Sequence, residues 1–156
     1  MSESIHIEAM QPADHAAVIE LWNACEGVRA NESPEELARI LDRNPGLCLV
    51  ARAVGSLAST SLAGAVLCGH DGRRGYLYHL GVDRACRRRG IATQLVDRCL
   101  AELTRLGIRR CTIFLIRGNA DGEAFWRSHG WRERTDLVAF ARDLDAPGCR
   151  PSGGEN

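Results

Sequence analysis

The sequence predicts a single domain of mixed α/β class, and three observations lead to this prediction. Short apolar stretches typical of strands alternate with amphipathic stretches of helical periodicity. The 156 residues are close to the usual size of a domain and are long enough to bury a substantial core. A strand, a basic glycine turn and a long helix follow one another in the second half. We expect the domain to cover residues 1–145 and the Gly-, Pro- and Ser-rich residues 146–156 to form a disordered tail.

The first expected elements are a strand and two helices. Residues 5–10 alternate as in a half-buried strand. Pro12 and Asp14 then open a helix, and its apolar stripe is formed by Val18, Leu21, Trp22 and Cys25. The second helix begins after a Ser33 cap, with proline and two acids in its first turn, and ends at the Asn-Pro-Gly sequence of residues 44–46.

The remaining strands are expected to begin with an antiparallel meander. Residues 47–54 and 62–68 are apolar enough for two strands, joined by a flexible hairpin loop at 55–61. A turn at 71–75 leads into a third strand, which covers residues 76–82. Further strands are predicted at 111–116 and at 134–144.

The turn Arg87-Arg88-Arg89-Gly90 is expected to bind a diphosphate. The glycine allows close approach of the backbone to an anion, and the first amides of the following helix have no acceptor within that helix. The apolar residues of the helix recur from Ile91 to Leu106, and Gly107 ends the pattern. An ordinary solvated basic turn is the alternative interpretation.

Composition argues against several classes of protein. The formal net charge is zero, which disfavours nucleic acid as a partner because binding to its backbone requires surplus positive charge. The seven cysteines are odd in number and no signal peptide begins the chain, so we expect reduced thiols and a cytoplasmic protein. Most of the cysteines lie in apolar stretches, and Cys86 beside the arginines lacks the partners of a catalytic thiol. Neither a membrane span nor metal-ligand spacing is present.

The order of these motifs resembles the GNAT family of N-acetyltransferases. The sequence Arg-x-x-Gly-x-Ala at 87–92, preceded by Leu-Gly-Val at 80–82, is similar to the acetyl-CoA motif of that family. A strand at 111–116, Asn119, an aromatic residue seven positions later and a Gly-aromatic pair at 130–131 extend the similarity. The resemblance covers residues 5–144 and implies a mixed, mostly antiparallel central sheet flanked by helices, with acetyl-CoA as co-substrate.

The resemblance also implies roles for individual residues in binding the cofactor. The backbone of Leu80, Gly81 and Val82 is expected to splay from its neighbour, bond the pantetheine arm and polarise the thioester carbonyl. The pyrophosphate is assigned to Arg87, Arg88, Arg89, Gly90, Ile91, Ala92 and Thr93. Asn119 and Trp126 complete the predicted cofactor site, although Asn119 can equally cap a helix and Trp126 can be a packing residue.

Two positions depart from the family pattern. Where many members have a tyrosine that protonates the leaving thiolate, this chain has Trp126, and an indole is no practical acid near neutral pH. Where members that acetylate protein N-termini place a glutamate, this chain has Phe114. The general acid and base are therefore not assigned by the resemblance.

Other residues are candidates for catalysis and for binding the acceptor. On the predicted strand 76–82, His79 can accept or donate a proton near neutral pH, and Tyr78 can donate one. Strand alternation places the two side chains on opposite faces, so that at most one faces the acceptor. Either residue can instead be an ordinary core residue. The polar loop between the first two helices supplies Glu26, Arg29 and Asn31, together with Glu32, as candidates for binding an amine and a carboxylate or as a plain solvated connection.

The sequence thus favours an acetyl-CoA-dependent N-acetyltransferase that acts on a small-molecule or amino-acid-like amine. A catalytically weak acyl-CoA-binding regulator is the alternative, because the tyrosine and glutamate positions are altered. A phosphate-binding or nucleic-acid module based on the arginine run is a third class, which the zero net charge disfavours. The final strands of this fold often pair between subunits, so a homodimer is also expected.

Overall fold

In the residues that the structure describes, 4–54 and 62–144 of a computed structural model, five strands form one sheet. The strands are β1 (Ser4–Ala9), β2 (Leu49–Val54), β3 (Leu62–His70), β4 (Gly75–Val82) and β5 (Cys111–Ile113). Their spatial order follows the sequence, and all neighbours are antiparallel except β4 and β5, which are parallel. The mixed, mostly antiparallel sheet and the meander are confirmed. The loop expected at 55–61 and the tail at 146–156 lie outside the described residues.

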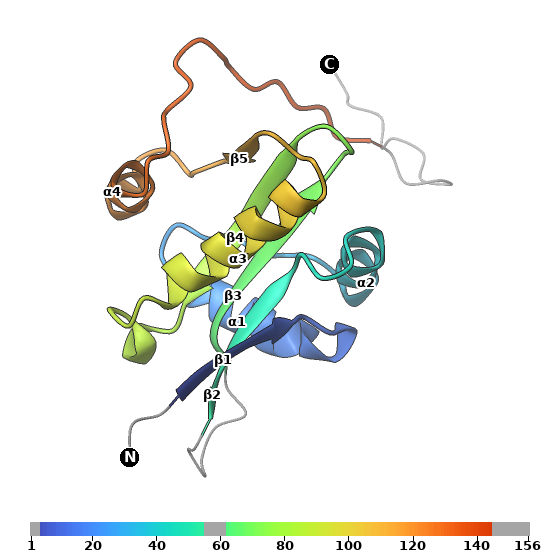
Figure 1. Ribbon diagram of the computed structural model, residues 1–156, viewed down its shortest axis with the longest axis vertical. Helices are drawn as coiled ribbons and strands as arrows, with labels where there is room; N and C mark the ends of the chain where they lie inside the picture. Colours follow the sequence, from blue (N-terminus) through green and yellow to red (C-terminus); the bar gives the residue numbers. More distant parts are fainter. Residues whose placement is uncertain (1–3, 55–61, 145–156) are drawn as a thin grey trace, which may run out of the picture.

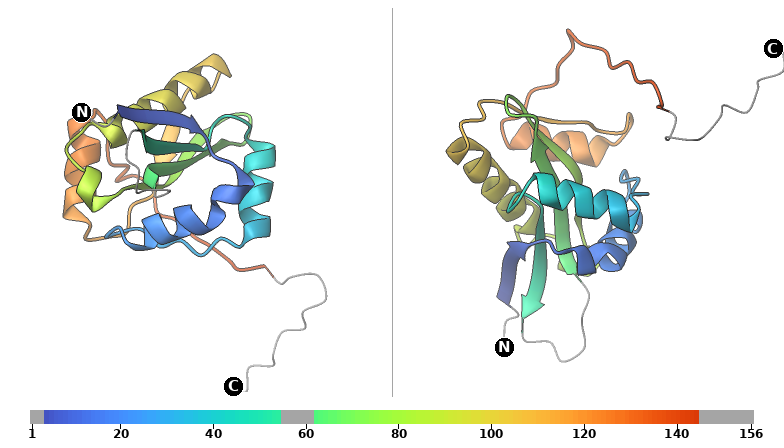
Figure 2. Two further views of the ribbon diagram at one scale, coloured as in Figure 1. Left: turned by 90° about the horizontal axis from the view of Figure 1, so that it is seen from below. Right: turned by 90° about the vertical axis from the view of Figure 1, so that its right-hand side faces the viewer.

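Helices cover both faces of this sheet (Figures 1 and 2). On one face lie α1 (His15–Asn23), which follows a 3-10 turn at Pro12–Asp14, and α2 (Pro34–Arg43). On the other face lies α3 (Ile91–Arg105), after a second 3-10 turn at Arg84–Cys86, while α4 (Ala120–Ser128) lies beyond β5. In the described part of the chain, no helix combines the length and apolarity that a membrane span requires.

Each face of the sheet has its own hydrophobic core. The core under α3 includes Leu77 of β4 and Leu95 of α3, both fully buried, and it extends to Trp126 of α4. The core under α1 and α2 includes Trp22 and Leu37, whose side chains are completely enclosed. Because both faces are covered, β3 is buried along almost its whole length, which explains its continuous apolar sequence.

The predicted ends of the helices are confirmed where short-range chemistry decides them. Ser33 and Glu36 form a reciprocal capping box at the start of α2, with the Glu36 amide donating to Ser33 Oγ at 3.1 Å and the Ser33 amide donating to Glu36 Oε2 at 2.7 Å. Gly107 follows α3 with a φ of +80°, in the left-handed region that glycine occupies at low cost.

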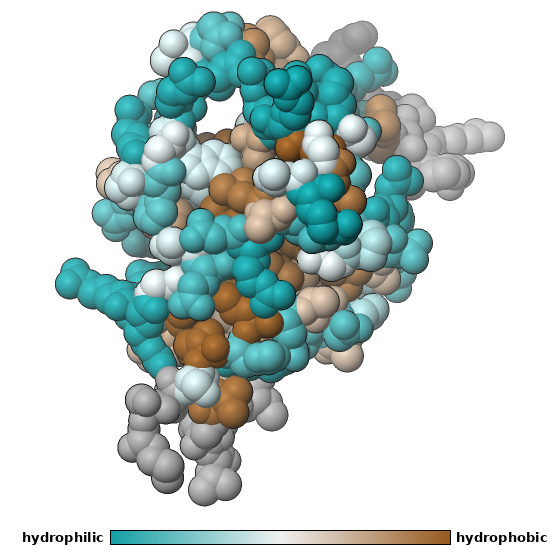
Figure 3. All heavy atoms as spheres, in the orientation of Figure 1, coloured by the Kyte–Doolittle hydropathy of each residue, from teal (hydrophilic) through white to brown (hydrophobic). Residues whose placement is uncertain are grey.

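The strands predicted at 134–144 are wrong. Residues 132–144 contain no helix or strand, and they form an open arch at the top of the molecule in Figures 1 and 3. A strand requires a partner edge, and β5 ends at Ile113 instead of continuing to residue 116. Instead, a bidentate pair between Arg134 and Asp136, with both distances 2.9 Å, forms locally within this segment.

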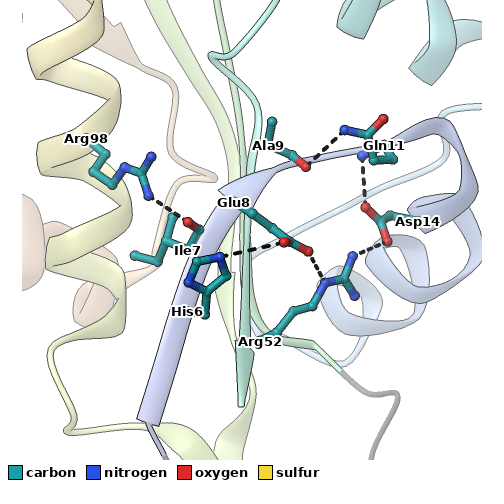
Figure 4. Close-up of polar contacts among 8 residues, drawn as sticks. All are labelled: His6, Ile7, Glu8, Ala9, Gln11, Asp14, Arg52 and Arg98. Carbon is teal, nitrogen blue, oxygen red and sulfur yellow. Dashed lines mark hydrogen bonds and ion pairs between the residues drawn. The ribbon is translucent and has the colours of Figure 1, made fainter. Parts of the chain in front are cut away.

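A polar cluster joins the first two strands to the start of α1 (Figure 4). Asp14 is 8% exposed; its Oδ1 accepts from Arg52 Nη2 at 2.6 Å, and its Oδ2 accepts from the Gln11 amide at 2.8 Å. Arg52 of β2 also donates through Nε to Glu8 of β1. The cluster therefore fixes the direction in which the chain leaves β1 and enters α1.

We expect the substitution Asp14→Ala to lower the free energy of unfolding by about 1–3 kcal/mol, because it leaves the Gln11 amide and the Nη2 group of Arg52 without their acceptor. The exposed carboxylate Asp42 of α2 provides the control, and Asp42→Ala should change stability by less than about 0.5 kcal/mol. Urea unfolding followed by circular dichroism measures both values. Equal effects of the two substitutions would contradict a structural role of the cluster.

Candidate active site

Strand β4 carries a bulge at the start of its predicted cofactor segment. Its register against β3 shifts between Ala65 and Leu67, so that His79 and Leu80 lie opposite a single residue of β3. His79 has a φ of +42°, in the left-handed region that non-glycine residues rarely adopt. Bulges of this kind bend a strand and redirect its side chains.

Beyond this point β4 and β5 separate. They pair from Gly75 to Leu77 on β4 and from Cys111 to Ile113 on β5, and β4 then continues to Val82 without β5 beside it. A cleft of about 450 Å³ occupies this opening. It is lined by the second half of β4, residues 113–116, residues 25–29 of the loop after α1, and α4. The expected splay of strand 80–82 from its neighbour is thus present in the structure.

The cleft brings together predicted site residues that are far apart in the sequence. Those that line it are Glu26, Arg29, His79, Leu80, Gly81, Val82, Arg87, Ala92, Asn119 and Trp126. Seven predicted residues do not line it, namely Asn31, Tyr78, Arg88, Arg89, Gly90, Thr93 and Ile91, the last of which is buried in the core under α3. The predicted residues outside the cleft fall into two groups. One group is the arginine-glycine turn with the first turn of α3, and the other consists of Asn31 and Tyr78.

The arginine-glycine turn forms the exposed start of α3. Gly90 is the residue before the first helical turn and has a φ of +72°, while its carbonyl accepts from the Gln94 amide at 3.0 Å. The amides of residues 91–93 therefore have no acceptor within the helix. Arg87 reaches back toward β4, with Nε donating to the Val82 carbonyl at 3.5 Å. Amides without an acceptor in the helix, a helix N-terminus and nearby guanidinium groups fit a diphosphate at the mouth of the cleft.

The position of Asn119 is compatible with both of the roles that the sequence allows. Its Oδ1 accepts from the Gly122 amide at 2.9 Å and so caps α4, and its side chain also lines the cleft. A Cβ atom on Gly27 would lie 2.4 Å from Asn119 Nδ2, which shows how closely the loop after α1 approaches α4. Gly27 has a φ of +78°, so glycine is required there both for its backbone conformation and for this contact.

His79 is paired with a carboxylate that the sequence analysis did not connect to it. Its Nε2 lies 2.5 Å from Oε1 of Glu32, and the two side chains are 20% and 19% exposed. The imidazole also lies against the ring of Trp22, with a centroid distance of 5.2 Å. Glu32 is 47 positions away in the sequence, and no local spacing signal links the two residues.

Tyr78 precedes the bulge of β4, and His79 belongs to it, so their side chains do not follow the alternation of a regular strand. It lies in a second hollow with Tyr76, Ile40 and Asn44, on the face that α1 and α2 cover, and its ring stacks on Tyr76 with a centroid distance of 6.2 Å. His79 contacts Trp22 on that same face, so the prediction of opposite faces is wrong. Partial burial and the neighbouring Tyr76 raise the pKa of Tyr78, which keeps its phenol protonated at neutral pH.

The loop after α1 is ordered by contacts with its own ends. The Ala30 amide donates to Asn23 Oδ1 at 3.2 Å, and the Asn31 amide donates to Glu32 Oε2 at 3.2 Å. Glu26 and Arg29 are exposed and line the cleft, so the structure places one acidic and one basic side chain at the expected acceptor end.

The aromatic residues at the two unusual positions are packed differently. Trp126 is 5% exposed and makes edge contacts with Phe125 and Trp131, so it packs in the core under α3 as well as lining the cleft. Phe114 is 63% exposed and stacks on Tyr76 with a centroid distance of 6.4 Å.

Cysteines that pack in the cores or against them behave as apolar residues. Burial raises the pKa of Cys48 to about 11 and that of Cys111 to about 12, so that both remain thiols at neutral pH. Neither residue lines the cleft. In the described residues, no group of three or more His, Cys, Asp or Glu side chains is arranged to hold a metal ion.

Comparison with known proteins identifies what this arrangement resembles. Residues 15–131 match the acetyltransferase (GNAT) family. An acetyltransferase of Sodalis glossinidius is 34% identical over 118 residues, which are 75% of this chain and 79% of that protein. An acetyltransferase of Yersinia enterocolitica is 34% identical over 116 residues, which are 74% of this chain and 79% of that protein.

Solved structures share the fold at lower sequence identity. The Ard1 protein of Thermoplasma volcanium superimposes with a TM-score of 0.68 at 16% identity, and the match covers 81% of each chain. A predicted acetyltransferase of Clostridium acetobutylicum, crystallised with acetyl-CoA, gives a TM-score of 0.63 at 15% identity over 88% of this chain and 96% of that chain. At these identities the similarity shows the fold.

The contact between Gly27 and Asn119 leads to a stability prediction. Both Gly27→Ala and Gly118→Ala place a side chain in a left-handed conformation, at a cost of about 1–2 kcal/mol. Gly118 has no atoms within 4 Å of the added Cβ, whereas at Gly27 the methyl group collides with the Asn119 side chain that caps α4. We expect Gly27→Ala to destabilise the protein by roughly 1 kcal/mol more, as loss of the cap would. Urea unfolding tests this, and equal losses would contradict the close approach.

Proposed function

The chain belongs to the acetyltransferase (GNAT) family, and we propose that it transfers an acetyl group from acetyl-CoA to a small, amino-acid-like amine, with His79 as the base. One observation supports this best: the cleft between the separated strands brings His79, the segment Leu80–Val82 and the charged loop residues Glu26 and Arg29 to one place.

The class of reaction follows from family membership. The family match covers residues 15–131, and relatives that are 34% identical over the aligned residues are named acetyltransferases. The chain is therefore an N-acetyltransferase, and acetyl-CoA is its co-substrate; one protein of the same fold was crystallised with that compound.

We propose that the exposed start of α3 binds the pyrophosphate of acetyl-CoA. The amides from Gly90 to Thr93 and the guanidinium groups of Arg87, Arg88 and Arg89 would supply the donors. Charge-assisted hydrogen bonds of this kind contribute about 1.5–3 kcal/mol each. Arg87 supports the assignment because it belongs to the turn and its Nε donates to the Val82 carbonyl at the end of β4.

The pantetheine arm and the thioester are assigned to the opening between β4 and β5. The backbone groups of Leu80, Gly81 and Val82 would bond the arm, and one of their amides would stabilise the negative charge that develops on the thioester oxygen. Asn119 and Trp126 line the same opening from α4. We assign them to the side of the cofactor that faces α4.

The chemistry requires a neutral amine at the acceptor end. An alkylamine with a pKa near 10.4 is almost entirely protonated at pH 7, and the difference corresponds to more than about 4 kcal/mol. Histidine is suited to accept this proton because its side chain changes protonation state near neutral pH. His79 lies beside Leu80, so a base there is next to the proposed position of the thioester. The thiolate is a good leaving group, and Trp126 supplies no acid.

The acceptor is proposed to carry both an amine and a carboxylate. Glu26 and Arg29 line the cleft with opposite charges, and such a pair is complementary to the two ends of an amino acid. Asn31 lies outside the cleft, so we assign it to the conformation of the loop, through its amide bond to Glu32.

A catalytically weak acyl-CoA-binding regulator is the second candidate. It is favoured by Trp126 and Phe114, which occupy the positions where the resemblance leads us to expect an acid and a base. Turnover of acetyl-CoA with an amine would exclude it, and binding without turnover would support it.

The expected homodimer remains a prediction. The arch at 132–144 exposes large apolar side chains, namely Leu137, Val138, Phe140 and Leu144, and a second copy of the chain is a partner that would cover them. The cytoplasmic location and the absence of a nucleic-acid partner also remain predictions.

The substitution Gly90→Glu tests the pyrophosphate site. It places bulk and negative charge where the anion is proposed to bind. Gly46→Glu is a matched control, because Gly46 has a similar φ of +77° and no atom within 4 Å of an added Cβ. At about 100 times the dissociation constant, acetyl-CoA should stabilise the parent protein and the control by roughly 2.7 kcal/mol, and Gly90→Glu should show no stabilisation. Thermal unfolding measures this. Undiminished stabilisation of Gly90→Glu would reject the site.

The substitution Arg29→Gln tests the acceptor class. We expect KM for the best amino acid acceptor to rise about tenfold or more, since a charge-assisted hydrogen bond is lost. The corresponding decarboxylated amine should be affected less than about twofold, because it lacks the carboxylate that Arg29 binds. Arg39→Gln, at an exposed position of α2, is the control. A similar change in KM for both acceptors would contradict carboxylate binding.

A further inference from the structure

We infer that Glu32 is a positioning residue for His79, and that the pair acts as a carboxylate-imidazole dyad in which the Nδ1 atom of His79 accepts the amine proton. This inference rests on the proposed function and gives Glu32 a role toward His79, whereas the sequence analysis named Glu32 only among the candidates for binding the acceptor.

The geometry of the pair supports this role. Nε2 of His79 lies 2.5 Å from Glu32 Oε1, a distance typical of a charge-assisted hydrogen bond. Both side chains are about four-fifths buried, so the solvent screens their interaction less than that of a surface pair. The second oxygen of Glu32 accepts from the Asn31 amide at 3.2 Å, so the carboxylate is held at both oxygens.

The backbone that carries Glu32 is anchored as well. The Glu32 carbonyl lies 2.7 Å from Nε2 of His15, at the start of α1, and the following residue, Ser33, caps α2. On the other side of the pair, the His79 ring lies against Trp22, whose side chain is completely buried. The position of Glu32 is thus fixed by α1 and α2, and the position of His79 is fixed by β4 and α1.

The hydrogen bond decides which ring nitrogen can act as a base. A carboxylate accepts and cannot donate, so the nitrogen that faces it must carry a proton. In the neutral imidazole this proton is on Nε2, which leaves the lone pair on Nδ1. The Glu32 carboxylate would also stabilise the imidazolium that forms when Nδ1 takes the proton of the acceptor, as the orienting acid does in serine hydrolases.

The conformation of His79 argues that the arrangement serves a purpose beyond packing. A non-glycine residue at a φ of +42° is strained, and strained backbone conformations are concentrated at functional sites. The bulge that imposes this conformation also places the imidazole at the cleft, next to the segment assigned to the thioester.

Two probe nucleophiles distinguish positioning of a base from a structural role. Ethanolamine is mostly protonated at pH 7.5 and needs a base, whereas hydroxylamine is mostly neutral and does not. Both are supplied in large excess with saturating acetyl-CoA, and the uncatalysed reaction is subtracted. Glu32→Gln replaces the carboxylate with an amide that can donate to Nε2 and stabilise the wrong tautomer. Glu35→Gln, three residues later on the exposed start of α2, is the matched control.

We expect Glu32→Gln to lower kcat with ethanolamine roughly tenfold to a hundredfold, and kcat with hydroxylamine less than about threefold. Acetyl-CoA should stabilise the variant and the parent protein equally. In the background of His79→Gln, the further substitution of Glu32 should have no additional effect, because Glu32 acts through His79. Equal losses with both nucleophiles, or full additivity of the two substitutions, would overturn the inference.

A spectroscopic readout separates failure of the dyad from failure of the proposed function. Nitrogen-15 NMR of labelled histidine, assigned with His79→Gln, should show the Nε2-protonated tautomer in the parent protein and loss of that preference in Glu32→Gln. If the parent protein shows neither stabilisation by acetyl-CoA nor turnover, the proposed function fails. In that case the tautomer alone decides whether Glu32 positions His79, and an Nδ1-protonated ring in the parent protein would overturn the inference.

Discussion

The site depends on the point where β4 stops pairing with β5. These two strands share a register of three residues, from Gly75 to Leu77 on β4, and the cleft begins where that register ends. Beyond it, the backbone groups of β4 on this edge form no hydrogen bonds with β5 and are available to a ligand. The bulge at His79 coincides with this separation, so one irregularity of β4 both opens the sheet and turns a titratable side chain toward the opening.

The surrounding packing keeps this irregular strand in place. Trp22 is completely buried beneath the bulge, and its Nε1 donates to the Ala65 carbonyl at 3.3 Å. A Cβ atom on Gly81 would lie 2.9 Å from the Trp22 ring, so the second half of β4 rests directly on α1. The helix that packs under the strand also leads into the loop that carries Glu26 and Glu32. Helix α1 therefore connects the strand at the cofactor end of the cleft with the loop at the acceptor end.

The parts of the structure that sequence reasoning predicted are those that short-range rules determine. The Ser33 cap, the end of α3 before Gly107 and the apolar periodicity of α3 are all predicted from neighbouring residues, and the structure contains them. The contact between His79 and Glu32 joins residues 47 positions apart, so no local pattern reveals it. The prediction that Tyr78 and His79 lie on opposite faces failed because a bulge adds a residue to β4 and interrupts the alternation of its side chains. Residues 134–144 have an apolar sequence, but β5 offers them no extended edge to pair with.

A crystal structure of the protein with acetyl-CoA bound tests most directly whether the opening between β4 and β5 is the cofactor site. We expect the pyrophosphate within hydrogen-bond distance of the amides between Gly90 and Thr93, and the thioester beside Leu80–Val82 in that opening. We also expect the acetyl group to point toward His79. A cofactor bound outside this opening, or β4 and β5 paired along their full length with the cleft closed, would show that the separation of the two strands does not form the cofactor site.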